Sequence, residues 1–226
     1  MGKFLDEPDF TLPQCAILTD DPMRVEMFTA HHLEQAKLYT RQRGMTGYSG
    51  SYGGVPVVVQ AVGYGGASLV VYLHELVSLY GVRTVIYAGE CVSRETSLLL
   101  RDLIVVSRAY AQADGVDCDE LLLKNATNAA RQCALPVRIN MVHTDDRFGT
   151  QELEPCCKRS CIVDYATYAL YEYAKRHSIA ALSLLVVSER FEECVAPDER
   201  QSRFHGLARL AFETAAYHKN NKKITL

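Results

Sequence analysis

The sequence predicts an α/β domain in which helices cover a mixed, largely parallel sheet. Short runs rich in β-branched residues alternate with longer stretches of helical period, which is typical of βαβ construction. Several of these runs are apolar at consecutive positions, as expected of strands covered on both faces. The 226 residues provide for an ample core and contain no repeat or linker-like shift in composition. We therefore expect residues 1–226 to form a single domain.

The pattern places the elements in order along the chain. The expected strands span residues 15–19, 55–62, 84–88, 103–109, 137–142 and 181–188. The expected helices span residues 68–80, 120–132, 165–177 and 197–218. Residues 48–54 contain a strand end and a glycine turn that lead into the second expected strand. This early hairpin makes the sheet mixed, and the polar stretch 143–160 is expected to be a loop.

Charge and hydropathy exclude two classes of partner. The 24 basic and 27 acidic residues give a formal charge of -3 and form no basic block that would match a nucleic-acid backbone. No apolar run approaches the roughly 20 residues that span a bilayer. The first ten residues are charged and lack the apolar segment of a signal peptide. We expect neither a nucleic-acid nor a membrane partner, and a cytoplasmic location.

The eight cysteines are expected to be reduced thiols, because they are scattered and no secretory segment supports their oxidation. Cys156, Cys157 and Cys161 lie close together in the sequence. They contain no CxxC pair and have no second ligand group at a zinc-like spacing. The sequence therefore predicts no metal site, and no cofactor is expected.

A glycine-rich turn, Gly63-Tyr64-Gly65-Gly66-Ala67-Ser68, follows an expected strand and opens a helix. Small residues there allow backbone amides to approach an anion or a polar ligand, although a tight structural turn is an alternative. The pattern is not the G-x-G-x-x-G of a dinucleotide site. Residues 20–24 and 89–91 follow two other strand ends. Because ligands of open α/β sheets bind at such carboxyl ends, we expect a small-molecule pocket where these segments converge.

Six segments together resemble the trimeric and hexameric nucleoside phosphorylases. They are residues 21–24 (DPMR), 43–50 (RGMTGYSG), 63–68 (GYGGAS), 81–82 (GV), 89–91 (GEC) and 187–189 (VSE). The likeness is greatest to bacterial-type purine nucleoside phosphorylase, with uridine phosphorylase and the nucleosidases as relatives. It implies a three-layer α/β/α sandwich around a central mixed, partly barrel-like sheet. It also implies a homo-oligomer, such as a dimer or a trimer of dimers, that binds a nucleoside or nucleobase and phosphate.

In that family, phosphate attacks the anomeric carbon of a nucleoside while an acid assists the departure of the base. Such a reaction requires a cationic phosphate cradle, acceptors for the ribose hydroxyls and a proton donor near the base. Each of these three requirements corresponds to positions in this chain.

The resemblance places the phosphate site at Arg24, Arg43, Asp20, Tyr87 and Glu90. Arg24 matches an arginine of the first loop, and Arg43 matches one that a neighbouring subunit supplies. Where the family has glycine, arginine and serine, this chain has Asp20, Tyr87 and Glu90. These changes remove one positive charge and add two carboxylates, which would oppose phosphate binding. We therefore expect Arg24 and Arg43 to pair with Asp20 and Glu90 and to fill the cradle with internal salt bridges.

At the ribose position, the family motif V-E-M-E-A corresponds to residues 163–167. Asp164 keeps the first acid, and Tyr165 replaces the methionine that packs on the sugar. Ala166 replaces the glutamate that accepts hydrogen bonds from the ribose, so the sugar loses an anchor. The resemblance also assigns Tyr64, Gly65 and Ser68 to the nucleoside-binding set.

At the base position, the purine enzymes have S-D where this chain has Ser188 and Glu189. Glu189 is one methylene longer than the family acid and is the expected catalytic acid. Arg200 matches the arginine that approaches this acid when the final helix closes. Arg147 and Phe148 are assigned to the loop that stacks on the base.

Three functions are consistent with these residues. One is an active purine nucleoside or uridine phosphorylase, and another is a nucleosidase in which Asp20 or Glu90 activates water. The third is a family member with impaired or altered catalysis that retains a nucleobase or nucleoside pocket. We favour the third, because several chemically distinct positions change together.

Overall fold

The computed structural model describes residues 2–112, 114–145, 161–191, 193–202 and 204–222. The strands are β1 (Cys15–Thr19), β2 (Glu34–Thr40), β3 (Gly47–Tyr52), β4 (Val55–Ala61), β5 (Thr84–Ser93), β6 (Leu103–Ala111), β7 (Asp114–Asp117), β8 (Val137–Thr144), β9 (Ile162–Asp164), β10 (Ala180–Arg190) and β11 (Glu193–Cys194). The helices are α1 (Pro22–His32), α2 (Gly66–Ser78), α3 (Glu120–Gln132), α4 (Thr167–His177), α5 (Pro197–Ser202) and α6 (His205–Lys222), with a 3-10 turn η1 (Gln42–Gly44).

The strands form one sheet that closes on itself in part. The order is β11-β10-β6-β8-β9-β5-β1-β4-β3-β2, with β7 paired to β6. Because β10 also pairs with β5, the strands β5, β10, β6, β8 and β9 form a closed ring. Both parallel and antiparallel neighbours occur, as β1 is parallel to β5 and β10 is antiparallel to β6. The predicted mixed, partly barrel-like sheet is therefore confirmed.

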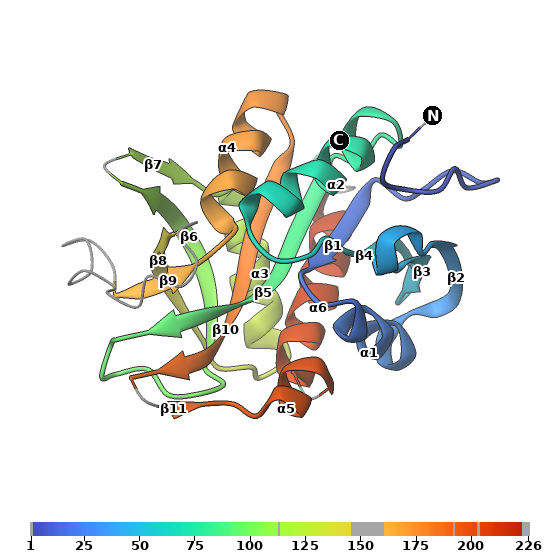
Figure 1. The fold of residues 1–226 in the computed structure, drawn as a ribbon. Helices are drawn as coiled ribbons and strands as arrows, with labels where there is room; N and C mark the ends of the chain where they lie inside the picture. Colours follow the sequence, from blue (N-terminus) through green and yellow to red (C-terminus); the bar gives the residue numbers. More distant parts are fainter. Residues whose placement is uncertain (1, 113, 146–160, 192, 203, 223–226) are drawn as a thin grey trace.

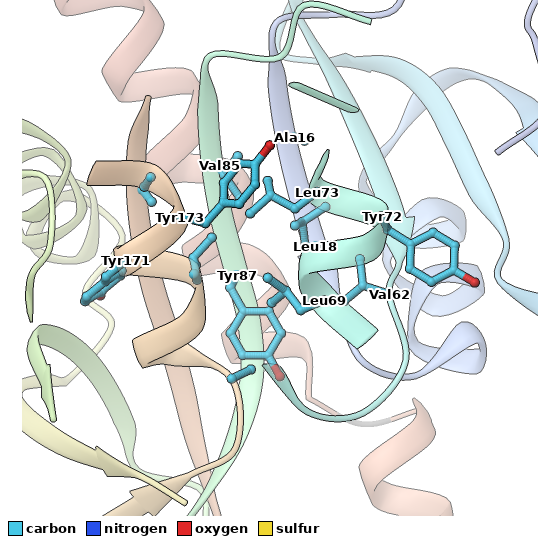
Figure 2. Close-up of a cluster of buried hydrophobic side chains, with 14 of the residues drawn as sticks. Ala16, Leu18, Val62, Leu69, Tyr72, Leu73, Val85, Tyr87, Tyr171 and Tyr173 are labelled. Atoms are coloured by element: carbon cyan, nitrogen blue, oxygen red, sulfur yellow. The ribbon is translucent and has the colours of Figure 1, made fainter. Parts of the chain in front are cut away.

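Helices cover the sheet on both faces, which gives the predicted three layers (Figure 1). Along β5, Val85 and Tyr87 belong to the buried cluster under α2 and α4. Ile86 and Ala88, which point to the opposite face, belong to the cluster under α1 and α6. Figure 2 shows the first cluster, in which side chains of β1, β5 and α2 meet. A strand covered on both faces explains the continuous apolar runs in the sequence.

The expected elements are present, and the differences have local causes. The bounds of β1 and α3 agree with the prediction, whereas β5 continues to Ser93. The expected final helix is divided into α5 and α6. Helix α1 was not predicted, although Asp21 as N-cap and Pro22 in the first turn are a helix-start signal. Strand β2 was not predicted either, because it is an edge strand whose exposed polar side chains give no alternating pattern.

Several parallel strands end at the same edge of the sheet. β1 is parallel to β4 and to β5, and β5 is parallel to β10. Their carboxyl ends therefore bring residues 19–24, 61–66, 89–93 and 188–190 together. This is the convergence that the sequence predicts, and it positions the candidate site.

The described part of the chain gives three further findings. None of its helices is long and apolar enough to cross a membrane. Its cysteines are free thiols, namely Cys15, Cys91, Cys118, Cys133, Cys161 and Cys194. Cys156, Cys157 and most of the expected 143–160 loop lie outside the described residues. Within these limits, no group of three or more histidine, cysteine or acidic side chains is arranged to hold a metal ion.

Candidate functional site

The glycine-rich turn connects β4 to α2 and forms one wall of the site. Gly63 and Gly65 have φ of 71° and 88°, a region that glycine adopts without strain. A Cβ on Gly63 would lie 2.6 Å from the Ser68 Oγ. That hydroxyl donates to the Val62 carbonyl at 2.6 Å, so Ser68 closes the turn. Tyr64 is 49% exposed, and its ring lies 5.2 Å from that of Tyr165.

A cavity of about 320 Å³ lies at this edge of the sheet. It is lined by Asp20, Asp21, Pro22, Tyr64, Glu90, Pro197, Arg200 and Gln201. These residues come from the β1–α1 connection, the glycine turn, β5 and α5. The pocket predicted at the converging strand ends is therefore present, and α5 adds a wall that the sequence pattern did not reveal.

Arg24 is held behind this cavity, where it is 1% exposed. It lies in the first turn of α1, which begins at Pro22 after the N-cap Asp21. Its Nη1 donates to Asp20 Oδ1 at 2.5 Å and to Thr19 Oγ1 at 3.1 Å. Its Nη2 donates to Glu90 Oε1, and Nε and Nη2 both donate to the Arg200 carbonyl at 3.1 Å. These five contacts equal the five N–H groups of a guanidinium.

The positive charge of Arg24 is balanced by two carboxylates inside the protein. Burial disfavours the charged guanidinium, but the carboxylates of Asp20 and Glu90 outweigh it and raise the pKa of Arg24. The predicted pairing of Arg24 with Asp20 and Glu90 is therefore confirmed.

Within this chain, Arg43 does not take part in the predicted pairing. Its side chain is exposed in η1, and the guanidinium carbon lies 5.4 Å from the centroid of the Phe4 ring. The second cation at Glu90 is instead Arg200, whose Nη1 lies 3.5 Å from Glu90 Oε2. The distance in sequence between Arg200 and Glu90 explains why strand-end patterns alone did not identify this pair.

Tyr87 lies in the core beside the cavity. Its side chain belongs to the cluster under α2, where Figure 2 shows it near Leu69. A Cβ on Gly89 would clash with the Tyr87 ring, so glycine at this position makes room for the tyrosine. Burial holds the pKa of Tyr87 well above its usual value, so the ring is neutral. A neutral aromatic side chain thus stands where the family resemblance implies a cation.

The Asp164 side chain accepts hydrogen bonds from backbone groups at the start of α4. Its Oδ2 accepts from the backbone N–H groups of Ala166 and Thr167 at 3.2 and 2.8 Å, and from the Thr167 hydroxyl. Its Oδ1 accepts from Thr144 Oγ1 at 2.6 Å. Burial raises the pKa of Asp164, although these hydrogen bonds act in the opposite direction. Ala166, which is 1% exposed, offers no side-chain acceptor to a sugar.

The residues expected near the nucleobase, Ser188 and Glu189, lie at the end of β10. Ser188 is buried, and its hydroxyl lies 3.5 Å from the Cys91 carbonyl. A β-bulge follows Val187 and precedes Glu189. Glu189 lies 3.8 Å from Arg94, which the sequence analysis missed because it ended the strand at residue 88. Arg200 contacts Glu90, not Glu189, so these two expected catalytic residues are not paired. Arg147 and Phe148 lie outside the described residues.

Comparisons with known proteins identify the family of this chain. It belongs to the phosphorylase superfamily, whose family model matches residues 14–148. Within it, the chain is similar to the DeoD-type purine nucleoside phosphorylase of Bacillus subtilis, with 32% identity over 217 residues, which cover 88% of this chain and 93% of the relative. The corresponding enzyme of Alkaliphilus metalliredigens is 31% identical over 221 residues, which cover 90% and 95%.

A solved structure supports the same placement at the level of the fold. The chain is similar to a purine nucleoside phosphorylase from Toxoplasma gondii in complex with immucillin-H, with a TM-score of 0.84 and 16% identity over 93% of each chain. The resemblance to nucleoside phosphorylases that the sequence predicts is thus confirmed.

Proposed function

We propose that this chain is a single nucleoside phosphorylase-like domain that binds a nucleoside or nucleobase in its cavity and does not carry out efficient phosphorolysis. The observation that carries this proposal is the set of acceptors around Arg24. Asp20, Thr19, Glu90 and the Arg200 carbonyl take up every donor of its guanidinium. No N–H of Arg24 is left to hold phosphate.

Electrostatics make the displacement of these partners costly. At an effective dielectric constant near 20, two unit charges about 4 Å apart interact by roughly 4 kcal/mol. A phosphate beside Arg24 would meet this repulsion from Asp20 and again from Glu90. Phosphate would also have to replace Asp20 and Glu90 as the hydrogen-bond partners of Arg24. Phosphate therefore competes poorly with the carboxylates already in place.

The pocket itself supports binding of a nucleoside-type ligand. The adjacent rings of Tyr64 and Tyr165 offer aromatic surface for a planar base. The relatives named above are purine nucleoside phosphorylases, which favours a purine over a pyrimidine. A sugar is anchored weakly, because Asp164 caps α4 and Ala166 has no acceptor. Impaired turnover and retained binding follow from the same geometry.

Calorimetry and a base-release assay test the proposal together. The purified protein is titrated with adenosine, inosine, uridine, hypoxanthine and inorganic phosphate. We expect binding of a purine nucleoside or base, no detectable phosphate binding and no phosphate-dependent release of base. Phosphorolysis at a rate of about 1 s⁻¹ or more, within the usual range of enzymes, would overturn the proposal.

A charge-neutralising variant sharpens this test. In Asp20→Asn/Glu90→Gln, Arg24 keeps its neighbours but loses both opposing charges, so phosphate affinity is expected to rise by at least about tenfold. The matched control is Asp117→Asn/Glu172→Gln, which neutralises two exposed partners of arginines away from the cavity. Equal phosphate affinity in both double variants would contradict the proposed role of Asp20 and Glu90.

Hydrolysis is the second candidate, and one observation favours it. Glu90 Oε2 is buried and has no hydrogen-bond partner among the described residues, while Glu90 lines the cavity. A carboxylate that turns toward the cavity from this position is able to take a proton from a water molecule. Release of base without phosphate, abolished in Glu90→Gln, is the result that this candidate requires.

Assembly and location remain part of the proposal. The family resemblance implies a homo-oligomer, and the exposed position of Arg43 agrees with a role toward a second subunit. Light scattering of the purified protein measures the oligomeric state. We also propose a cytoplasmic location, which imaging of the tagged protein in its native cell tests.

A further inference from the structure

Three histidines meet where the end of α1 packs against the start of α6 (Figure 1). His31 and His32 are the last two residues of α1, and His205 is the first residue of α6. The rings of His31 and His205 lie edge to face, with their centroids 4.9 Å apart. None of the three lines the cavity, so the proposed function makes no use of them.

The His32 ring is packed among aromatic side chains. It stacks on Phe212 of α6 at 5.1 Å between centroids and 26° between planes, and it lies 6.1 Å from Tyr52 of β3. Its Nε2 is buried and has no hydrogen-bond partner among the described residues. A charged imidazolium here would bury an N–H without an acceptor, so this packing favours the neutral ring.

The charges around His32 act in the same direction. Burial is the largest cause that lowers its pKa below the usual value of 6.5, and the positive charges of His31, His205 and Arg209 lower it further. Glu213 opposes them, but its carboxylate already accepts from the Tyr52 hydroxyl at 2.9 Å. The surroundings of His32 are therefore suited to the neutral imidazole.

The other ionisable side chains described on the neighbouring elements have partners of their own. Glu34 is exposed on β2, and Cys133 of α3 lies beside Arg209 and Glu213. The remaining groups are directed elsewhere: Glu26 to Tyr48, Arg24 to Asp20, Glu199 to Arg101, and Arg200 to Glu90. Glu213 is thus the acid that faces the three histidines.

Mild acid adds positive charge to this contact. A histidine in water gains its second proton near pH 6.5. His31 Nδ1 lies 2.9 Å from the Met27 carbonyl, which only accepts, so Nδ1 keeps its proton and Nε2 is the atom that titrates. Once protonated, His31 and His205 carry like charges on rings that touch across the contact.

The two helix ends respond to these charges in opposite ways. A helix C-terminus favours a cation, and a helix N-terminus disfavours one. His31 and His32 end α1, so their charges are acceptable on that helix alone. His205 begins α6, where both the helix terminus and His31 oppose its charge. Separation of the start of α6 from α1 relieves the repulsion.

The start of α6 is connected to the wall of the cavity. Phe204 directly precedes α6 and is 4% exposed, and its ring centroid lies 5.3 Å from the guanidinium carbon of Arg24. Helix α5 comes before it in the chain and lines the cavity with Pro197, Arg200 and Gln201. A displacement of the start of α6 therefore acts on this wall.

We propose that His31, His32 and His205 form a pH-sensitive joint, which holds α6 against α1 at neutral pH and loosens that contact, together with α5, in mild acid. A site built on two helices needs a contact that a few charges can bias, and the three rings provide it. This inference goes beyond the proposed function and requires no ligand.

Hydrogen exchange followed by mass spectrometry tests the joint. The purified protein is measured at about pH 7.5 and about pH 5.5, on either side of the usual histidine value, with rates corrected for the intrinsic effect of pH. Peptides from the end of α1, from α5 and from the start of α6 are compared with α2, which lies on the opposite face of the sheet. The variants are His32→Phe, which keeps an aromatic ring, His205→Gln, and the control His74→Gln, an exposed histidine on α2.

In the wild type, we expect the three segments to lose at least about threefold more protection than α2 when the pH is lowered. The loss should be smaller in His32→Phe and in His205→Gln, and unchanged in His74→Gln. The melting temperature should likewise fall less with acid in these two variants than in the wild type. The sign follows from the lowered pKa of His32, whose contribution to stability is present above pH 6.5 and is lost as the pH falls through the folded value.

Two results would overturn the joint. One is a loss of protection spread evenly over the chain, α2 included. The other is an acid response of His205→Gln equal to that of the wild type. Because His205 is exposed, its replacement keeps the test decisive even where His32→Phe disturbs the packing. Nucleobase binding at neutral pH is a separate measurement, so either result leaves the proposed function standing.

Discussion

Two corners of the candidate site hold their charges in different ways. Near β1, Arg24 is 1% exposed between Asp20 and Glu90, and each of its donors has an acceptor. Near the end of β10, the Arg94 and Glu189 side chains are 31% and 39% exposed and lie 3.8 Å apart. Both corners contain an arginine and a carboxylate, but only the first is removed from water.

The contrast shows how burial converts a binding group into a structural one. A charge in the interior requires partners and hydrogen bonds, and once these are present the group is held in one arrangement. An exposed ion pair contributes little free energy, so its members remain able to rearrange around a ligand. Glu189 is thus able to change partners, whereas Arg24 is held in one arrangement.

The largest effect is expected from Arg24→Ala. Removal of the guanidinium leaves the buried Asp20 without its cation and Glu90 with Arg200 alone, and we expect a loss of about 3–5 kcal/mol in the free energy of unfolding. Urea denaturation measures this loss. In the triple variant Arg24→Met/Asp20→Asn/Glu90→Gln, the charges leave together and much of the loss should be regained. Equal instability of the single and triple variants would show that packing, not charge, is responsible.

An intermediate effect is expected at Asp164, which is buried like Arg24 but has neutral partners. Asp164→Ala removes the acceptor of the N–H groups of Ala166 and Thr167 at the start of α4 and is expected to cost about 2–3 kcal/mol in the free energy of unfolding. Asp164→Asn keeps an oxygen for the cap and should cost less. A loss from Asp164→Asn as large as that from Asp164→Ala would contradict the capping role.

The pH dependence of the unfolding free energy of these variants tests the raised pKa of Asp164. Burial raises the pKa of Asp164 above its usual value of 3.8. Its contribution to stability is therefore complete below pH 3.8 and is lost as the pH rises through the higher folded value. As the pH is raised from about 4 to 7, the wild type should lose unfolding free energy relative to Asp164→Asn, because only the wild type has a carboxyl group at this position to ionise. A difference that is constant with pH would contradict the raised pKa.

The smallest effect is expected from Arg94→Ala. Because the Arg94–Glu189 pair is partly exposed, its loss should change the free energy of unfolding by no more than about 1 kcal/mol. Added salt should reduce the difference further. A loss as large as that of Arg24→Ala would remove the distinction between the two corners.

Much of the fold could be predicted from local sequence. The periodicity of residues 120–132 and the β-branched run 15–19 gave correct bounds for α3 and β1. The pairing of Arg24 with Asp20 and Glu90 was predicted from the family resemblance, which places these three residues in one cradle, and from their opposite charges. The edge strand β2 was missed, because its side chains are exposed and carry no alternating pattern.

The details of the site were less predictable. The Ser68 hydroxyl and the Asp164 carboxylate belong to residue types that bind nucleosides, yet both are engaged by nearby backbone groups. Residue type fixes what a side chain is able to bind, while the backbone around it decides which partner it meets. The role of Asp164 at the start of α4 could have been inferred from its position three residues before Thr167.

The sequence by itself determined the α/β class, the strand ends that meet at one edge and the excess of carboxylates among them. Only the tertiary structure decided that Arg24 is saturated, because the Arg200 carbonyl that completes its hydrogen bonds is 176 residues away along the chain. It also decided that Arg200 faces Glu90 and that Arg43 does not. Local patterns arise from neighbouring residues, whereas the partners of a buried charge depend on which distant segments fold against it.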